Sequence, residues 1–271
     1  MNSKSLIKIL ICLLPIHSIL SSAERGIARS FSETKSSKQQ KAKIKKVANK
    51  SKINLKKDSI GTYSWQNKKY LKYNIHGWLV YFEEVLVNKK NVLGKRTARR
   101  LNRDLRHASR KLPSAALAHL QSVAIWVDFN TVEFPGGVYH PSATWLQENG
   151  FDPKMEKSLH IGVAQNYLTW TQHQPLMVLH ELSHAYHHQV LGYDNQSIID
   201  AYNAAVKSEK YENVKYHDGQ IMNAYALTNE KEYFAETSEA FFGTNDYYPF
   251  KRKDLKKHDR EMFNLLKKLW N

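Results

Sequence analysis

His180, Glu181 and His184 are the residues whose types and spacing most directly predict chemistry in this chain. They stand in the segment His-Glu-Leu-Ser-His at 180–184. On an α-helix, positions i and i+4 lie on one face, about 6 Å apart along the axis, so both imidazoles can bind one ion. The carboxylate beside the first histidine then lies next to a water on that ion, where it can act as a general base. The segment therefore predicts a zinc site with His180 and His184 as ligands and Glu181 as the base.

The flanking sequence is typical of the helix that this geometry requires. Gln174 and Pro175 mark a helix start, apolar residues recur from Leu176 onward, and Gly192 marks the end. We therefore expect one helix over residues 174–191.

A catalytic zinc ion usually has three protein ligands and an open position for water, so a third ligand is required. His187 and His188 are the nearest candidates, and His188 repeats the i+4 step from His184. Three consecutive turns of one straight helix cannot converge on a tetrahedral ion, so His188 is predicted to lie behind the ligands or at the surface. The longer metzincin pattern is excluded, because it requires a glycine where this chain has His187 and a histidine where it has Val190.

An acidic segment near residue 232 supplies the next candidate. Glu232 and Glu236 are four residues apart, and Phe234 and Phe241 are seven apart, so a helix over 230–242 would dock through its aromatic face. If its acidic face meets the histidines, Glu232 completes the zinc site. Glu236 can then accept a hydrogen bond from a ligand histidine and hold its tautomer.

Asp246 is the remaining alternative for the third ligand. The segment Gly-Thr-Asn-Asp at 243–246 resembles the Gly-Thr-x-Asp signature of aspzincins, whose third ligand is an aspartate. That signature continues with Tyr-Gly, whereas this chain reads on to Pro249 and Phe250.

The histidine pair, taken together with residues 225–236, resembles the catalytic domain of anthrax lethal factor and its relatives. These proteins are zincins in which the glutamate before an aromatic-aromatic-Ala-Glu step binds zinc and a tyrosine seven residues upstream assists catalysis. The resemblance implies a zinc metallopeptidase acting on a peptide or protein substrate, with Glu232 as third ligand and Tyr225 as helper. It covers about residues 174–245, and it extends to secreted bacterial proteins with similar strings around both motifs. Toxin action is not implied, because no receptor-binding or substrate-docking domain has room here.

The first residues are typical of a secretory signal peptide, predicted over 1–23. Lys4 and Lys8 precede a short apolar core at 9–16, and Ser-Ser-Ala at 21–23 offers a cleavage site. The only cysteine, Cys12, lies inside this segment, so the mature chain has His, Asp and Glu alone as metal ligands. We expect a secreted, periplasmic or extracellular protein with no transmembrane segment in the mature chain.

Positive charge is concentrated in residues 24–58. They hold 12 Lys and Arg against 3 acids, or +9 of the total formal charge of +16. The segment has few large apolar residues, and burying them would not offset the conformational entropy lost on folding. It is therefore predicted to be a disordered linker or propeptide. The segment can contact anionic surfaces. Specific nucleic-acid recognition is not predicted, because no aromatic residues alternate with the lysines.

Residues 59–271 are predicted to form one α+β, zincin-like catalytic domain. Its expected parts are a small mixed sheet, the helix with the two histidines, and a mostly helical C-terminal half. The remaining expected elements are strands in 70–87, 123–127 and 159–164, and helices at 95–111, 114–120, 196–208 and 252–269. Either residues 137–139 or residues 159–163 are expected to form the sheet edge that adds a substrate as a strand.

Two other function classes remain open from the sequence. One is a non-catalytic extracellular binding protein on the same scaffold, and the other is a zinc hydrolase of cell-wall peptides. His140 is either a substrate contact near the cleft or an ordinary loop histidine.

Overall fold

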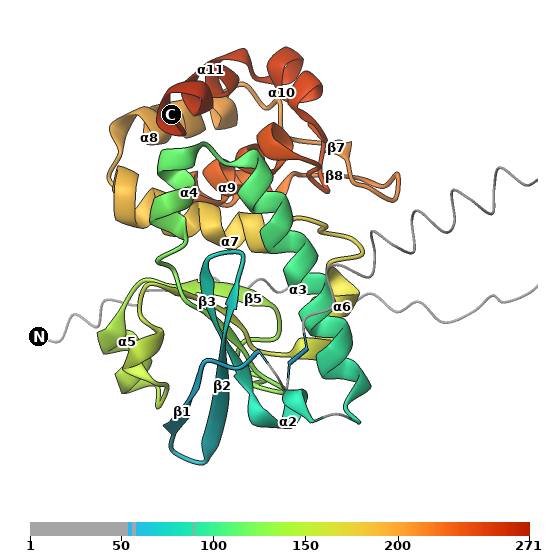
Figure 1. The fold of residues 1–271 in the computed structure, drawn as a ribbon. Coiled ribbons are helices and arrows are strands. Elements are labelled where there is room, and N and C mark those ends of the chain that lie inside the picture. Colours follow the sequence, from blue (N-terminus) through green and yellow to red (C-terminus); the bar gives the residue numbers. More distant parts are fainter. Residues whose placement is uncertain (1–53, 56–57, 89) are drawn as a thin grey trace, which may run out of the picture. The chain divides into compact units, whose positions relative to one another are not determined.

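A six-stranded mixed sheet forms the first half of the described chain (Figure 1). Strands β1 to β3 are an antiparallel meander, β3, β4 and β6 run parallel, and β5 returns antiparallel to β6. The spatial order is β1-β2-β3-β4-β6-β5, which leaves β5 at one edge. The strands are β1 (Gly61–Trp65), β2 (Lys68–Ile75), β3 (Trp78–Glu83), β4 (Ile125–Val127), β5 (Gly137–His140) and β6 (Ser158–Ile161).

The computed structural model describes residues 54–55, 58–88 and 90–271. Leu55–Asn271 form one compact unit. The predicted signal peptide, and all but a few residues of the predicted basic segment 24–58, lie outside the described residues.

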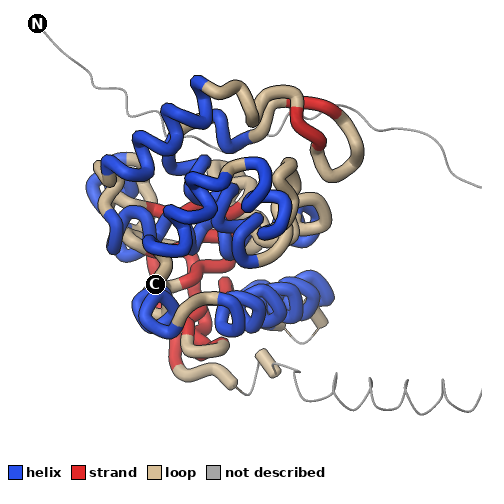
Figure 2. Tube along the Cα trace, turned by 90° about the horizontal axis from the view of Figure 1, so that it is seen from above, coloured by secondary structure: helices blue, strands red, loops and turns tan. Residues whose placement is uncertain are grey.

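Helices make up most of the C-terminal half, and they lie over the sheet when viewed from above (Figure 2). The helices of this half are α6 (Ala164–Trp170), α7 (Met177–Tyr186), the short π-helix η3 (His187–Leu191), α8 (Gln196–Lys207), the 3₁₀ turn η4 (Tyr225–Leu227), α9 (Glu230–Phe242), α10 (Arg252–His258) and α11 (Arg260–Leu269). A short hairpin, β7 (Val214–Lys215) and β8 (Ile221–Met222), joins α8 to η4. The predicted α+β class, with a mixed sheet and a mostly helical C-terminal half, is confirmed.

The first half also contains helices. They are α2 (Glu84–Val87), α3 (Val92–Lys111), α4 (Ser114–Leu120), α5 (Ala143–Glu148) and the 3₁₀ turn η2 (Pro153–Met155). The long helix α3 packs on α6 and α7 through a face that includes Leu101, Leu105 and Ala108. No helix among the described residues has the length and apolar character needed to cross a bilayer.

The central strand β4 is buried because it is apolar on both faces. Ile125, Trp126 and Val127 have no exposed surface, as expected for a strand covered from both sides. Trp126 stacks on Tyr81 of β3 at 3.9 Å and meets Tyr70 of β2 edge-on at 5.1 Å. Aromatic packing therefore joins the antiparallel meander to the parallel part of the sheet.

The predicted helix over 252–269 is wrong as one continuous element. Asp259 leaves the helical conformation, with φ −138° and ψ 81°, and separates α10 from α11. Its buried carboxylate accepts hydrogen bonds from the Tyr233 hydroxyl at 2.6 Å and from the Met262 backbone N–H at 3.1 Å. This N-cap and tyrosine contact replace the helical hydrogen bonds lost at the break.

Candidate metal centre

The two histidines of α7 point into the protein from adjacent turns. His180 is buried, and the His184 side chain is 12% exposed. The two Nε2 atoms lie 3.1 Å apart. The neighbouring apolar residues of the same helix, Leu179, Leu182 and Ala185, are buried as well. Their burial holds α7 inside the protein, and the two histidines are carried inward with it.

Glu232 approaches the histidines from the first turn of α9. The side chain of Asn229 caps this helix by accepting hydrogen bonds from the backbone N–H groups of Lys231 and Glu232, both at 2.9 Å. The cap fixes where α9 begins and so where Glu232 points. Its Oε2 lies 3.0 Å from His180 Nε2 and 3.3 Å from His184 Nε2.

The three ligand atoms form a triangle with edges of 3.0, 3.1 and 3.3 Å. A tetrahedral zinc ion with bonds of about 2.0–2.1 Å holds its ligand atoms about 3.3 Å apart. The donor set of two imidazole nitrogens and one carboxylate oxygen, without thiolates, also matches catalytic zinc sites. His180, His184 and Glu232 therefore form a candidate metal site whose geometry fits zinc.

A second carboxylate holds the far side of His180. Its Nδ1 lies 2.8 Å from Glu239 Oε1 and 3.6 Å from Glu236 Oε1, so the closest partner is Glu239 rather than Glu236. Burial disfavours charge on the imidazole, but Glu232 and Glu239 outweigh it and raise the pKa of His180 well above its usual value. With one nitrogen facing Glu239, the other is directed at the candidate metal position.

Glu236 instead belongs to a group of buried acids behind the ligands. Its Oε2 accepts a hydrogen bond from Asn245 Nδ2 at 3.1 Å. Burial, and then the nearby carboxylates of Asp246 and Glu239, raise the pKa of Glu236 well above its usual value. Burial and Glu239 likewise raise the pKa of Asp246 to about 7. Among the described residues, Asp246 is in neither group of side chains whose ligand atoms cluster closely enough for one metal.

Glu181 is buried between α7 and the edge strand β5. The backbone of Tyr139 in β5 stabilises the charged form of its carboxylate and so acts to lower its pKa. A Cβ atom added at Gly137 would lie 3.3 Å from the Glu181 Cγ, so β5 passes close to this side chain. Burial raises the pKa of Glu181, whereas His184 and His180 act in the opposite direction.

The sheet order distinguishes the two segments expected to offer a strand edge. β6, which contains most of residues 159–163, pairs with β4 on one side and β5 on the other. Within the described part of the chain, β5 pairs only with β6, and it lies at the end of the sheet, beside α7. The edge next to Glu181 is therefore β5.

His187 and His188 follow the ligand pair in the short π-helix η3. His187 is fully buried, between Phe234 and Tyr193, and neither ring nitrogen has a hydrogen-bond partner among the described residues. His188 is half-buried, and its Nδ1 is 2.9 Å from the Tyr139 hydroxyl. His187 therefore packs among aromatic rings next to the site, whereas His188 lies within hydrogen-bond distance of a side chain of the edge strand β5.

Tyr225 begins η4, the turn before α9, and is half-buried. Its assistance in catalysis stays a prediction. His140 lies in β5 rather than in a loop, and its Nε2 is 3.2 Å from His160 Nδ1. His160 in turn lies 3.2 Å from the buried Asp128, so His140 belongs to a polar network of the sheet.

Two neighbours of the site were not expected from the sequence. Glu239 follows Glu232 by seven residues, a helical repeat that would have placed both on one face. Tyr193 stacks on His188 with ring centroids 4.9 Å apart. Burial, followed by the nearby Tyr139 and Glu181, raises the pKa of Tyr193. Tyr193 comes from the turn after η3, and no local motif marks it.

In comparisons with known proteins, no family model, no curated protein and no solved structure matches this chain. The assignment of the site therefore rests on its own residues and their geometry.

Proposed function

We propose that the chain is a zinc-dependent metallopeptidase that hydrolyses peptide bonds. One observation carries the proposal, namely the triangle of His180, His184 and Glu232 with the buried carboxylate of Glu181 beside it. The position of Glu181 supports a catalytic role, because metal binding by His180, His184 and Glu232 does not require a second carboxylate there.

The side chains present divide the chemistry between them. Bound zinc would polarise the scissile carbonyl and lower the pKa of a coordinated water. Glu181, buried beside β5, accepts a proton from the attacking water and delivers it to the leaving amine. Glu239 keeps His180 in the tautomer that leaves Nε2 free to bind metal.

The position of β5 supports a peptide as the substrate class. An extended peptide adds to a free sheet edge through main-chain hydrogen bonds, largely independently of its side chains. β5 is an edge strand and passes within contact distance of Glu181. A peptide paired with β5 would therefore lie beside the general base.

The resemblance to the lethal factor family extends the proposal beyond the geometry. It supports a zincin-like fold with a glutamate third ligand, and it assigns Tyr225 as a donor to the developing oxyanion. Such a donor typically contributes about 3 kcal/mol to lowering the barrier. Secretion, directed by residues 1–23, and contact of residues 24–58 with an anionic surface are parts of the same proposal.

The test combines metal content with turnover in three variants and one matched control variant. Zinc per chain is measured by mass spectrometry for the wild type, Glu232→Ala, Asp246→Ala and Glu181→Gln, and turnover is measured with a fluorogenic peptide library. Glu230→Ala is the matched control, because Glu230 lies in the same turn of α9 as Glu232. Circular dichroism verifies that each variant is folded.

We expect one zinc per chain, lost with Glu232→Ala and kept in the other variants. Glu181→Gln should reduce turnover by about 10²–10⁴-fold, the usual contribution of a general base. Full turnover in Glu181→Gln would overturn the mechanism, and zinc lost only with Asp246→Ala would assign the third ligand to the aspartate. Zinc binding without turnover of any peptide would favour the binding protein, and turnover of isolated cell wall alone would favour the wall hydrolase.

A further inference from the structure

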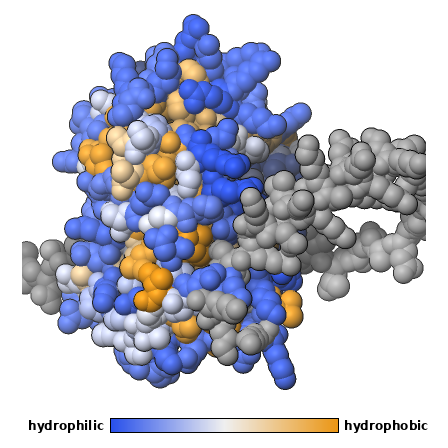
Figure 3. Space-filling model, viewed as in Figure 1, coloured by the Kyte–Doolittle hydropathy of each residue, from blue (hydrophilic) through white to orange (hydrophobic). Residues whose placement is uncertain are grey.

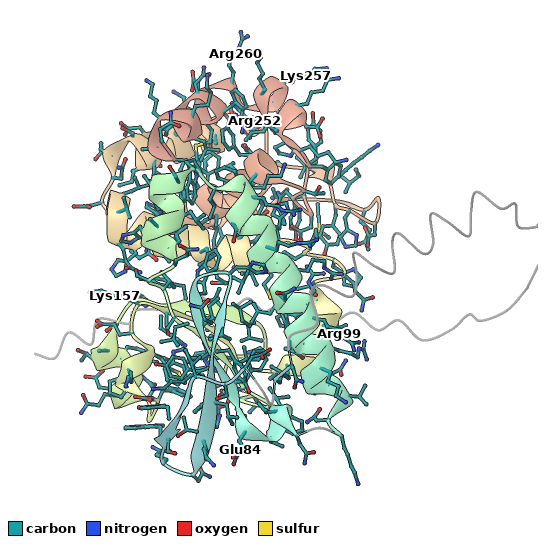
Figure 4. All side chains as sticks on the ribbon, viewed as in Figure 1. Glu84, Arg99, Lys157, Arg252, Lys257 and Arg260 are labelled. Atoms are coloured by element: carbon teal, nitrogen blue, oxygen red, sulfur yellow. The ribbon has the colours of Figure 1, made fainter. Side chains whose placement is uncertain are left out.

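Five arginines of α3 form a line on the side of the helix that faces solvent. At 100° and 1.5 Å per residue, they fall within an arc of about 80° and extend over about 21 Å. The buried Leu101 and Leu105 lie roughly opposite this arc. Figure 4 shows one of the five, Arg99, on the outer side of the helix. The arginine line consists of Arg96, Arg99, Arg103, Arg106 and Arg110, all of them exposed.

This line has almost no compensating negative charge. The helix contains eight basic residues and one acid, Asp104. Asp104 Oδ2 is occupied by Arg100 Nε at 2.7 Å and by the Tyr167 hydroxyl at 2.5 Å. Within the part of the chain that the structure describes, only Arg103 of the line has a carboxylate oxygen within 4.0 Å. A solvated helix face usually mixes both signs of charge, so this face is suited to an external anion.

Hydrophilic residues cover most of the coloured surface on the face of the molecule drawn in Figure 3. All five positions of the line are arginine and none is lysine. The planar guanidinium donates two parallel hydrogen bonds to a phosphate, which a lysine ammonium cannot do. Charges recurring about every 5 Å suit an extended polyanion, because a small anion would contact only one or two of them.

Two features of α3 narrow the kind of polyanion. The helix contains no Phe, Tyr or Trp, so it offers no platform on which nucleobases can stack. Its apolar face is covered by α6 and α7, so it cannot insert into a bilayer as an amphipathic helix would. We infer that α3 binds a linear phosphate polymer without bases, along the arginine line. This inference is independent of the proposed peptidase activity.

The helix is well anchored for this role. Arg100, which lies outside the line, donates hydrogen bonds to the backbone carbonyls of Thr171 and Pro175. These two carbonyls lie in the segment just before α7. A polymer held on the arginine line would therefore be bound to a rigid helix that also supports the metal centre.

The experiment measures binding of the full chain to medium-chain inorganic polyphosphate as a function of salt concentration. One variant replaces three arginines of the line, Arg99, Arg103 and Arg106, with Gln. The matched control replaces Lys253, Lys257 and Arg260 with Gln, which removes the same charge from exposed positions of α10 and α11 (Figure 4). A third variant replaces the same three arginines of the line with Lys. Residues 24–58 are present in every protein, so their contribution to binding cancels.

Each phosphate contact contributes about −0.7 to the slope of log affinity against log salt, so losing a contact reduces the magnitude of that slope by about 0.7. We expect the Gln variant of the line to reduce the magnitude by about 2 and the control to change it little. The Lys variant should keep most of the slope and lose affinity, because charge is kept and the paired hydrogen bonds are lost. Equal losses in the line and control variants would overturn the inference, since binding would then follow net charge alone.

Competition separates the other polyanions. Polyglutamate at matched charge should compete poorly, because its carboxylates stand on side chains of a peptide backbone and are spaced further apart along the polymer than the phosphates of polyphosphate. An oligo-dT strand that displaces polyphosphate at lower concentration would contradict a base-free partner. Binding to phosphatidylglycerol vesicles that depends on the line, without binding to polyphosphate, would assign the surface to a membrane instead.

Discussion

The contact between Glu239 and His180 leads to a prediction that separates two neighbouring glutamates. Glu239 Oε1 lies 2.8 Å from His180 Nδ1, and the corresponding distance from Glu236 is 3.6 Å. Glu239 also accepts a hydrogen bond from Gln174 Nε2 at 3.2 Å. Replacing either glutamate with Gln keeps the size of the side chain and removes the charge. Zinc affinity should therefore fall further in Glu239→Gln than in Glu236→Gln.

The magnitude follows from the role of such partners. Loss of a carboxylate that orients a ligand histidine typically weakens metal binding by 10–100-fold, which is about 1.4–2.7 kcal/mol. Because Gln can still accept through its amide oxygen, Glu239→Gln should lie near 10-fold and Glu239→Ala near 100-fold. Glu236 is beyond hydrogen-bond distance of the imidazole, so Glu236→Gln should cost less than about 3-fold.

The assay is competition for zinc between the protein and a chromogenic chelator of known affinity, at constant pH and salt. Thermal unfolding of each zinc-free variant serves as the control for general loss of structure. An affinity that falls more in Glu236→Gln than in Glu239→Gln would refute the reasoning. Unchanged affinity in both variants would show that neither carboxylate orients His180.

Two further predictions concern stability. Burial lowers the pKa of His187 to about 3, against an ordinary value of 6.5, so protons bind preferentially to the unfolded chain as pH falls through 6.5. As pH falls from 6.5 to 3, the free energy of unfolding of His187→Phe should therefore decrease less steeply than that of the wild type. Relative to their difference at neutral pH, the variant should gain about 2 kcal/mol at pH 5, measured by urea unfolding. Parallel pH profiles for the two proteins would contradict this. Gly94→Ala should destabilise the fold by about 3 kcal/mol or more in the same assay at neutral pH, because the new Cβ would lie 1.8 Å from the Leu86 carbonyl oxygen. An exposed helical glycine would instead gain about 1 kcal/mol from this change, so a stabilised variant would disprove the clash.

The local part of the candidate site could be predicted from the sequence because one helix determines it. Residues four apart on a helix share a face whatever the rest of the protein does, so the pairing of His180 with His184 needs no tertiary information. The same holds for which face of α3 is buried and which is exposed, because its apolar and basic residues fall on different sides by helical periodicity alone. The basic character of residues 95–111 was visible in the sequence, and their buried side follows from the same pattern.

Tertiary structure decided every relation between elements. Glu236 and Glu239 both face α7 from one helix, and only the packing of α9 on α7 brings Glu239 closer to His180. Likewise, β5 is the free edge because the parallel pairing of β6 with β4 places β6 inside the sheet, a pairing that no local pattern of residues 158–161 encodes. The break at Asp259 has the same origin, since the Tyr233 hydroxyl that stabilises it comes from a helix 26 residues away. Helical periodicity acts over one turn and is written in the sequence, whereas the depth and rotation at which two elements pack depend on all the side chains between them.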